Sequence, residues 1–430
     1  FALERFSSEF DWLPKAQGWR MNLDHLVVIQ NRQLWPPGRL SIARRESPTG
    51  QVDLRLGADY LGLHGLSQLL AMFSPAGSEW QQILTGLSPA GHLTRLRLAH
   101  SRDGVTAAPR WRVSGSVTHY HQQPWERIPG LSGLALNFEG NQDGGTLLLD
   151  SKNFKTEMPR LFRGPLIANK LDGYFKWRFN PQDGLRLQTR DLSMSTDHVE
   201  TFSRLDLQLP LNGESPFIDM QTDFWDGDGA HKSRYLPAGI MPRPLVEWLD
   251  RAFVSGFVKA GSMLLYGPLK GFPYQAHEGR FEVLFGVEDL LLDYLPGWPR
   301  LEQATAEAHF LNNSLSISLS GGRMLESRLR QASAQIRQLK GGSPVEISTV
   351  ADGPLSDVLR VLAETPLRER FERFTSVVSA SGQSTTRLEL KVPLRKTDRL
   401  ALSGQLELHQ AALQLRESNL RAEGLEGRLQ

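Results

Sequence analysis

Apolar and polar residues alternate along most of the chain. Between Leu171 and Phe179 the odd positions are apolar or glycine and the even positions are mostly charged. The same period of two continues from Leu205 to Leu211 and from Ile218 to Phe224. This period is typical of β-strands with one apolar face. Together with glycine, proline and Asp-Gly turns, it predicts roughly twenty strands and a mainly β fold.

Three segments replace this alternation with helical spacing, at about residues 60–87, 237–255 and 354–375. In the second segment, Leu245, Trp248, Leu249 and Ala252 recur every three or four residues, and Pro244 suits a first helical turn. We expect Gly256 to end this helix. The sequence thus predicts short helical plugs that interrupt the sheet.

Two architectures can hold this many strands. Twisted open sheets seldom exceed ~10 strands without curling or splitting. The strands therefore divide into ordinary sandwiches or form one long, strongly curled sheet whose apolar face lines a groove. A single alternating strand on its own favours the sandwich, because a half-buried face normally packs on another sheet.

One long stretch, from Tyr235 to Phe285, resembles the AsmA-like envelope proteins, specifically their YhdP branch. The sequence Tyr-Leu-Pro precedes a predicted helix that contains Trp-Leu-Asp. The motifs Leu-Tyr-Gly, Phe-Pro-Tyr and Glu-Gly-Arg-Phe-Glu-Val follow in that order. The matching positions are Tyr235, Leu236, Pro237, Trp248, Leu249, Gly256, Tyr266, Gly267, Phe272, Pro273, Tyr274, Glu278, Gly279, Phe281 and Val283. The resemblance is close over roughly residues 130 to 320 and more general on either side.

The resemblance implies a bridge-like protein that carries phospholipids between the inner and outer membranes of a Gram-negative bacterium and supports the outer-membrane permeability barrier. It implies phospholipids as partners, contact with both membranes through parts outside this chain, and a periplasmic location on an inner-membrane-anchored protein. It also favours the curled sheet: a long, mostly antiparallel sheet that forms an apolar groove interrupted by helical plugs.

We expect three groove segments, each with one plug: residues 1–130, 131–322 and 323–430. Because the chain starts at Phe1 and stops within an alternating segment, we interpret it as a fragment of a longer protein.

Alternation also predicts which side chains line the groove. These are Leu134, Leu136, Phe138, Phe175, Trp177, Phe179, Leu205, Leu207, Leu209, Phe281, Val283, Phe285, Leu315, Ile317 and Leu319. The alternative for each of them is packing under a plug or against neighbouring sheets. Transferring a lipid chain through water costs ~0.8 kcal/mol per exposed CH2, which a continuous apolar face would largely offset.

Composition excludes several other classes. The net charge is only +2, from 49 basic and 47 acidic residues, so nucleic acid is not an expected partner. The chain has no cysteine, which excludes disulfides and cysteine metal sites. It also contains no apolar run of the ~18 residues that a membrane-spanning helix needs.

The chain shows no catalytic motif, so we expect neither an enzyme nor a cofactor. It contains no Gly-x-Ser-x-Gly, His-Glu-x-x-His, P-loop or dinucleotide glycine pattern. Asp226 and Asp228 hint at a calcium loop, but Ala230 and Pro237 occupy the fifth and twelfth positions, and a hairpin turn fits better. His119 and His121 lack an evident third ligand, so no metal site is predicted.

Two other functions stay open from the sequence: a structural or protein-binding β scaffold of the envelope, and a carbohydrate-active β protein. No local pair of carboxylates recommends a glycosidase.

Overall fold

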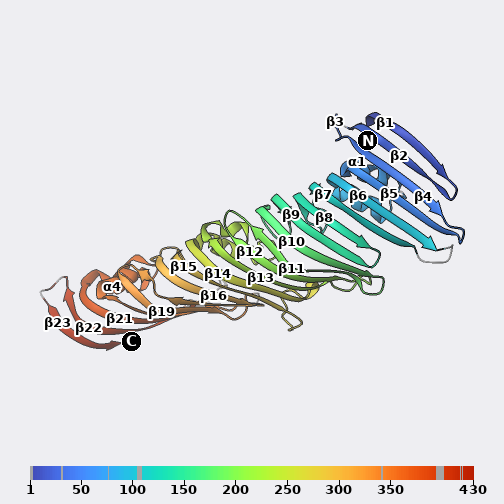
Figure 1. Ribbon diagram of the computed structural model, residues 1–430. Coiled ribbons are helices and arrows are strands. Elements are labelled where there is room, and N and C mark those ends of the chain that lie inside the picture. The colour runs from blue at the N-terminus through green and yellow to red at the C-terminus, as the bar shows by residue number, and fades with distance from the viewer. Residues whose placement is uncertain are drawn as a thin grey trace. The chain divides into compact units, whose positions relative to one another are not determined.

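The computed structural model describes residues 3–30, 32–75, 77–103, 109–339, 342–393, 401–416, 418 and 420–430. Its strands belong to one large antiparallel sheet (Figure 1). The prediction of a mainly β, single-sheet fold with a few helices is confirmed, and the sandwich alternative is wrong. The chain divides into two compact units, which are described separately: unit 1 holds residues 1–197 and 201–220, and unit 2 holds residues 198–200 and 221–430.

The first thirteen strands are β1 (Leu3–Lys15), β2 (Gly18–Gln30), β3 (Gln33–Leu34), β4 (Gly38–Glu46), β5 (Gln51–Gly62), β6 (Ala90–Asp103), β7 (Arg110–Gln122), β8 (Gly130–Asn141), β9 (Gly144–Glu157), β10 (Leu166–Asn180), β11 (Gly184–Ser195), β12 (Glu200–Leu209) and β13 (Phe217–Asp228). The others are β14 (Phe253–Pro268), β15 (Arg280–Leu292), β16 (Leu301–Leu311), β17 (Ser314–Ser320), β18 (Arg323–Met324), β19 (Ser327–Ile336), β20 (Val345–Pro354), β21 (Val378–Val392), β22 (Ala401–Leu415) and β23 (Arg421–Leu429).

Many strands are longer than the alternation predicts. Strand β14 has 16 residues, although its pairing with β15 shifts register at three points. A bulge adds a residue without ending the ladder, so alternation read from the sequence breaks where the strand continues. Strand β1 was not predicted.

The helices are α1 (Leu63–Phe73), α2 (Glu79–Leu87), α3 (Arg243–Ala252), α4 (Leu355–Glu364), α5 (Arg368–Val377) and the short 3-10 helices η1 (Gly229–Arg234) and η2 (Leu269–Gly271). Pro244 lies in the first turn of α3, as expected. The expected stop at Gly256 is wrong, because α3 ends at Ala252 and Phe253 already has extended backbone. Gly256 lies inside β14.

The helices pack on the sheet through specific contacts. In α4, Leu355 is 3% exposed and belongs to a buried cluster with Leu408 and Ala411 of β22. In α3, the indole Nε1 of Trp248 donates a hydrogen bond of 2.9 Å to the Tyr294 carbonyl oxygen. These contacts fasten the helical segments to the unit in which they lie.

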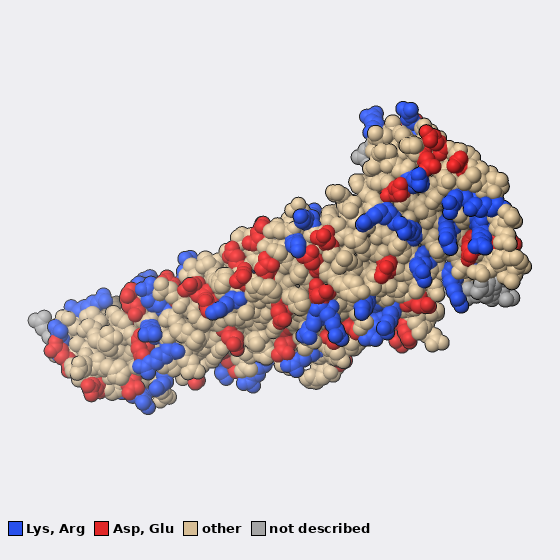
Figure 2. Space-filling model, viewed as in Figure 1, with Lys and Arg blue, Asp and Glu red and all other residues tan. Residues whose placement is uncertain are grey.

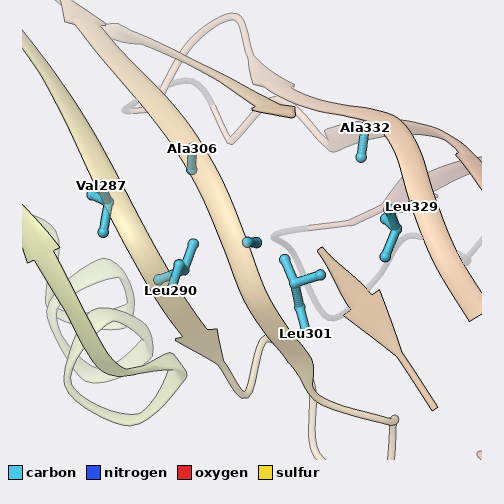
Figure 3. Packing of buried hydrophobic residues seen from close by; sticks show 7 residues of the cluster. Val287, Leu290, Leu301, Ala306, Leu329 and Ala332 are labelled. Carbon is cyan, nitrogen blue, oxygen red and sulfur yellow. The ribbon is translucent and has the colours of Figure 1, made fainter. Parts of the chain in front are cut away.

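The largest buried cluster lies in unit 2, on strands β15, β16 and β19. Figure 3 shows Val287 and Leu290 of β15 beside Leu301 and Ala306 of β16, with Leu329 and Ala332 of β19 across from them. Phe285, Ile317 and Leu319 pack against this cluster. The core is therefore built from one face of neighbouring strands of a single sheet.

Candidate functional site

An unbroken row of apolar or glycine residues crosses the strands of unit 1 on one face. Residues directly opposite each other in neighbouring strands share a face of the sheet. From β1 to β11, omitting the short β3, the row reads Trp12, Met21, Ile42, Leu56, Leu98, Val113, Gly140, Gly145, Trp177 and Leu187. We call this set the apolar row of unit 1.

One residue away along each strand, a second row on the opposite face contains no large apolar side chain. This second row reads Asp11, Asn22, Ser41, Gly57, Arg97, Ser114, Glu139, Thr146, Lys176 and Gln188. We call it the polar row of unit 1. Because both rows cross the same ten strands, the sheet of unit 1 is apolar along one row and polar along the row directly behind it.

Unit 2 repeats the arrangement with different residues. Its apolar row, from β14 to β22 without β18, reads Gly261, Phe285, Ala308, Ile317, Ala334, Ile347, Leu390 and Leu402. The neighbouring positions from β15 onward read Gly286, Glu307, Ser318, Ser333, Ser348, Glu389 and Ser403. Each unit thus has its own continuous apolar face.

Glycines in the apolar rows lie against aromatic rings. A Cβ on Gly140 would come within 2.6 Å of the Trp177 ring, and one on Gly145 within 2.8 Å of its Nε1. A Cβ on Gly261 would meet the Phe224 ring at 2.4 Å. An aromatic ring that covers a glycine of a neighbouring strand keeps the face apolar where the row has no side chain of its own.

The structure places the fifteen sequence-predicted groove residues on five strands. They are Leu134, Leu136 and Phe138 on β8; Phe175, Trp177 and Phe179 on β10; Leu205, Leu207 and Leu209 on β12; Phe281, Val283 and Phe285 on β15; and Leu315, Ile317 and Leu319 on β17. Trp177, Phe285 and Ile317 belong to the apolar rows themselves. Their contact with lipid stays a prediction.

Neighbouring rows bring more of these residues together. Phe175 and Phe138 both lie opposite Leu147. In unit 2, Val283 and Leu315 both lie opposite Phe310. Phe175 and Leu315 are only 8% and 4% exposed, whereas Phe179 at the end of β10 is 39% exposed. These members of the predicted set therefore lie close to one another within their own unit, with exposures that range from buried to exposed.

The first half of the apolar row of unit 1 was missed as a candidate site. Its members from Trp12 to Leu98 lie on β1, β2, β4, β5 and β6. The signal was present, because Leu40 and Ile42, and Leu54 and Leu56, alternate with polar residues in the sequence.

Charged side chains of both signs are spread over the visible surface in Figure 2. On the polar face of unit 1, Arg186 Nε donates a hydrogen bond of 2.8 Å to Asp206 Oδ1. This guanidinium holds the pKa of the Asp206 carboxyl below its usual value. On the polar face of unit 2, Arg280 in the same way lowers the pKa of Glu282, which also bonds His309 at 2.7 Å. These exposed pairs contribute little to stability and mark this face as the hydrated one.

The motif stretch identified in the sequence forms a packing unit around Tyr274. This side chain is fully buried, and Cβ atoms on Gly267 and Gly279 would lie within 3.0 and 2.7 Å of its ring. The Phe272 ring packs on Tyr274 and on Phe281, with centroid distances of 5.9 and 5.2 Å. The motif glycines therefore make room for an aromatic cluster, which is a structural role.

The family comparison decides what kind of protein carries this face. The model of the YhdP protein family matches residues 2–430. The chain belongs to the YhdP family. This YhdP-family chain is 26% identical over 414 residues to the "Intermembrane phospholipid transporter YhdP" of Escherichia coli (strain K12). The alignment covers 94% of this chain and 31% of that relative, so the chain spans about a third of the relative's length.

Two other findings complete the comparison. No solved structure matches the chain. Among the described residues, no helix of this YhdP-family chain is both long and apolar enough to cross a membrane.

His119, His121 and Asp228, which the sequence analysis considered as metal ligands, have other contacts in the structure. The His119 ring packs on His92 at a centroid distance of 5.5 Å, whereas His121 Nδ1 lies 2.7 Å from Ser132 Oγ. Asp228 does not form a hairpin turn as expected; its carboxylate accepts the Ala230 N–H at 2.9 Å and caps η1.

Proposed function

We propose that this YhdP-family chain is a section of a conduit that carries phospholipids between the inner and outer membranes of a Gram-negative envelope. The observation that carries the proposal is the pair of apolar rows, one in each unit, that cross strand after strand without a polar residue. The acyl chains lie along these rows, in a groove formed by the curl of the sheet.

The energetics favour such a path. An acyl chain in water costs ~0.8 kcal/mol per exposed CH2, or on the order of 10 kcal/mol per chain. A row of leucine, isoleucine, valine and aromatic side chains replaces that water contact without directional bonds. Because no single contact is strong, a lipid can move from one strand to the next without a deep energy minimum.

The polar headgroup stays in water at the open side of the groove. The proposal therefore needs no fixed anion-binding residue on the apolar face, and the apolar rows contain none. By the same reasoning the chain is not an enzyme: its work is transfer of a lipid, not a chemical step. The transfer supports the outer-membrane permeability barrier.

The proposal places the chain in the periplasm as part of an inner-membrane-anchored protein. Contact with either membrane is then made outside residues 1–430.

Lipid extraction and native mass spectrometry of the purified chain test the proposal. We expect phospholipid to co-purify with the chain and to be replaced by added phospholipid of another mass. A folded chain that never carries phospholipid would contradict it and would favour a structural or protein-binding scaffold. Binding or turnover of sugars instead would favour the carbohydrate-active alternative.

A further inference from the structure

Three potential metal ligands from separate segments meet in unit 2. His198 lies in the connection between β11 and β12, Asp228 is the last residue of β13, and His231 lies in η1. One ligand atom from each lies within 4.8 Å of the other two. This is the one such group of three found in the described part of the chain. Sequence inspection noticed Asp228 but not the two histidines.

The main chain holds these residues in place. The Asp228 N–H donates a hydrogen bond of 2.8 Å to the His198 carbonyl oxygen. Oδ1 of Asp228 accepts the Ala230 N–H at 2.9 Å, which leaves Oδ2 facing His231 Nδ1 at 2.7 Å. The two imidazole rings are stacked, with centroids 3.8 Å apart and planes 3° from parallel.

The chemistry of the three groups suits a transition-metal ion. The Ala230 N–H and then the His231 side chain hold the pKa of Asp228 below its usual value, so the carboxylate is ionised at neutral pH. Two imidazoles and one carboxylate, with room for water, are a common ligand set for Zn²⁺. A calcium site would need more oxygen ligands than this cluster provides.

We propose that His198, Asp228 and His231 bind one divalent transition-metal ion of the Zn²⁺ class. The ion fastens η1 to the segment that carries His198. When the ion binds His231 at Nδ1, any proton on that nitrogen passes to water and the neutral ring carries its proton at Nε2. The stacked rings turn so that the ion lies in the plane of each ring. The exposed Arg234, whose guanidinium lies 3.4 Å from His198 Nε2, swings away to water. This proposal does not depend on lipid transport.

Isothermal titration of the chelator-treated chain with Zn²⁺ at neutral pH tests the site. We expect one site per chain, and a loss of affinity of at least about tenfold in His198→Gln and in His231→Gln. Asp228→Asn separates the two roles of this residue. Asparagine also caps a helix, so the variant removes the charged ligand and keeps the cap. His119→Gln in unit 1 is the matched control and is expected to bind as the wild type does.

The proposal is overturned if the wild type binds Zn²⁺ no more tightly than His198→Gln does. X-ray absorption of the Zn²⁺-loaded wild type gives a readout that does not depend on the variants folding. Two imidazole ligands support the site, and a spectrum without imidazole overturns it.

Discussion

The apolar and polar rows of unit 1 cross the same ten strands one residue apart, yet their side chains are of opposite polarity. The apolar row contains two tryptophans, six aliphatic or methionine side chains, and two glycines under the Trp177 ring. The polar row contains arginine, lysine, acids, amides, hydroxyls and one glycine.

This contrast shows that the apolar face of a single-layer sheet has to be covered by something other than a second sheet. In a sandwich, the apolar face of one sheet is covered by another. Here the described strands belong to one sheet, so no second sheet covers its apolar face. Helices such as α4 cover part of that face, and in our proposal lipid covers more of it. Substitutions on one face of the sheet can therefore be compared with substitutions on the other.

The largest expected effect comes from charges on the apolar face of β10. We expect Phe175→Asp with Trp177→Asp to abolish phospholipid binding and transfer between vesicles, because a buried carboxylate cannot lie beside acyl chains without a large desolvation cost. Phospholipid per chain, measured by mass spectrometry, and transfer of labelled lipid are the readouts.

The matched control puts the same charges on the other face of the same strand. Tyr174→Asp with Lys176→Asp changes exposed positions and is expected to leave lipid binding unchanged. Because Phe175 is only 8% exposed, Val283→Asp in unit 2 provides a second variant at a half-buried position. Unchanged lipid content in folded Phe175→Asp, Trp177→Asp protein would count against the groove.

A smaller effect is expected from filling the space that an aromatic ring occupies. We expect Gly261→Ala to lower the free energy of unfolding by about 1–3 kcal/mol, because its Cβ would lie 2.4 Å from the Phe224 ring and 2.6 Å from the Phe285 Cβ. Gly286→Ala on the adjacent strand is the control, since its Cβ meets nothing closer than 4.0 Å. Equal losses in a denaturant titration of the two variants would refute the ring-over-glycine packing.

The smallest effect is expected on the polar face. Asp206→Asn removes a carboxylate whose pKa is lowered by Arg186, so the stabilisation is present at neutral pH and is lost as the pH falls through the lowered pKa of the folded state. We expect a loss of less than about 1 kcal/mol at pH 7, because exposed ion pairs contribute little. Thermal unfolding at several pH values checks this. A difference between variant and wild type that grows toward acid pH would contradict the sign.

Much of the fold could be predicted because alternation is a local signal. The helices at residues 63–73, 243–252 and 355–364 and the strands after them follow from spacing within a few residues. Which face of each strand is apolar follows in the same way, as Phe175 and Trp177 against Lys176 show.

Other features depend on contacts that the sequence does not display. The register that brings Trp177 over Gly140 and Gly145 is set by pairing across three strands. The end of α3 at Ala252 follows from the start of β14 and not from a glycine signal. The candidate metal site brings His198 to Asp228 and His231, which lie 30 and 33 positions later in the chain and share no motif with it.

Photo-crosslinking along β10 tests the central claim most directly. A photoreactive amino acid is placed either at Trp177, in the apolar row, or at Lys176, in the polar row. The two positions are adjacent in the chain and lie on opposite faces of the sheet. In Gram-negative cells, our account predicts crosslinked phospholipid at position 177 and none at position 176. Crosslinks to phospholipid in equal amounts at both positions, or crosslinks at position 177 to protein alone, would contradict it.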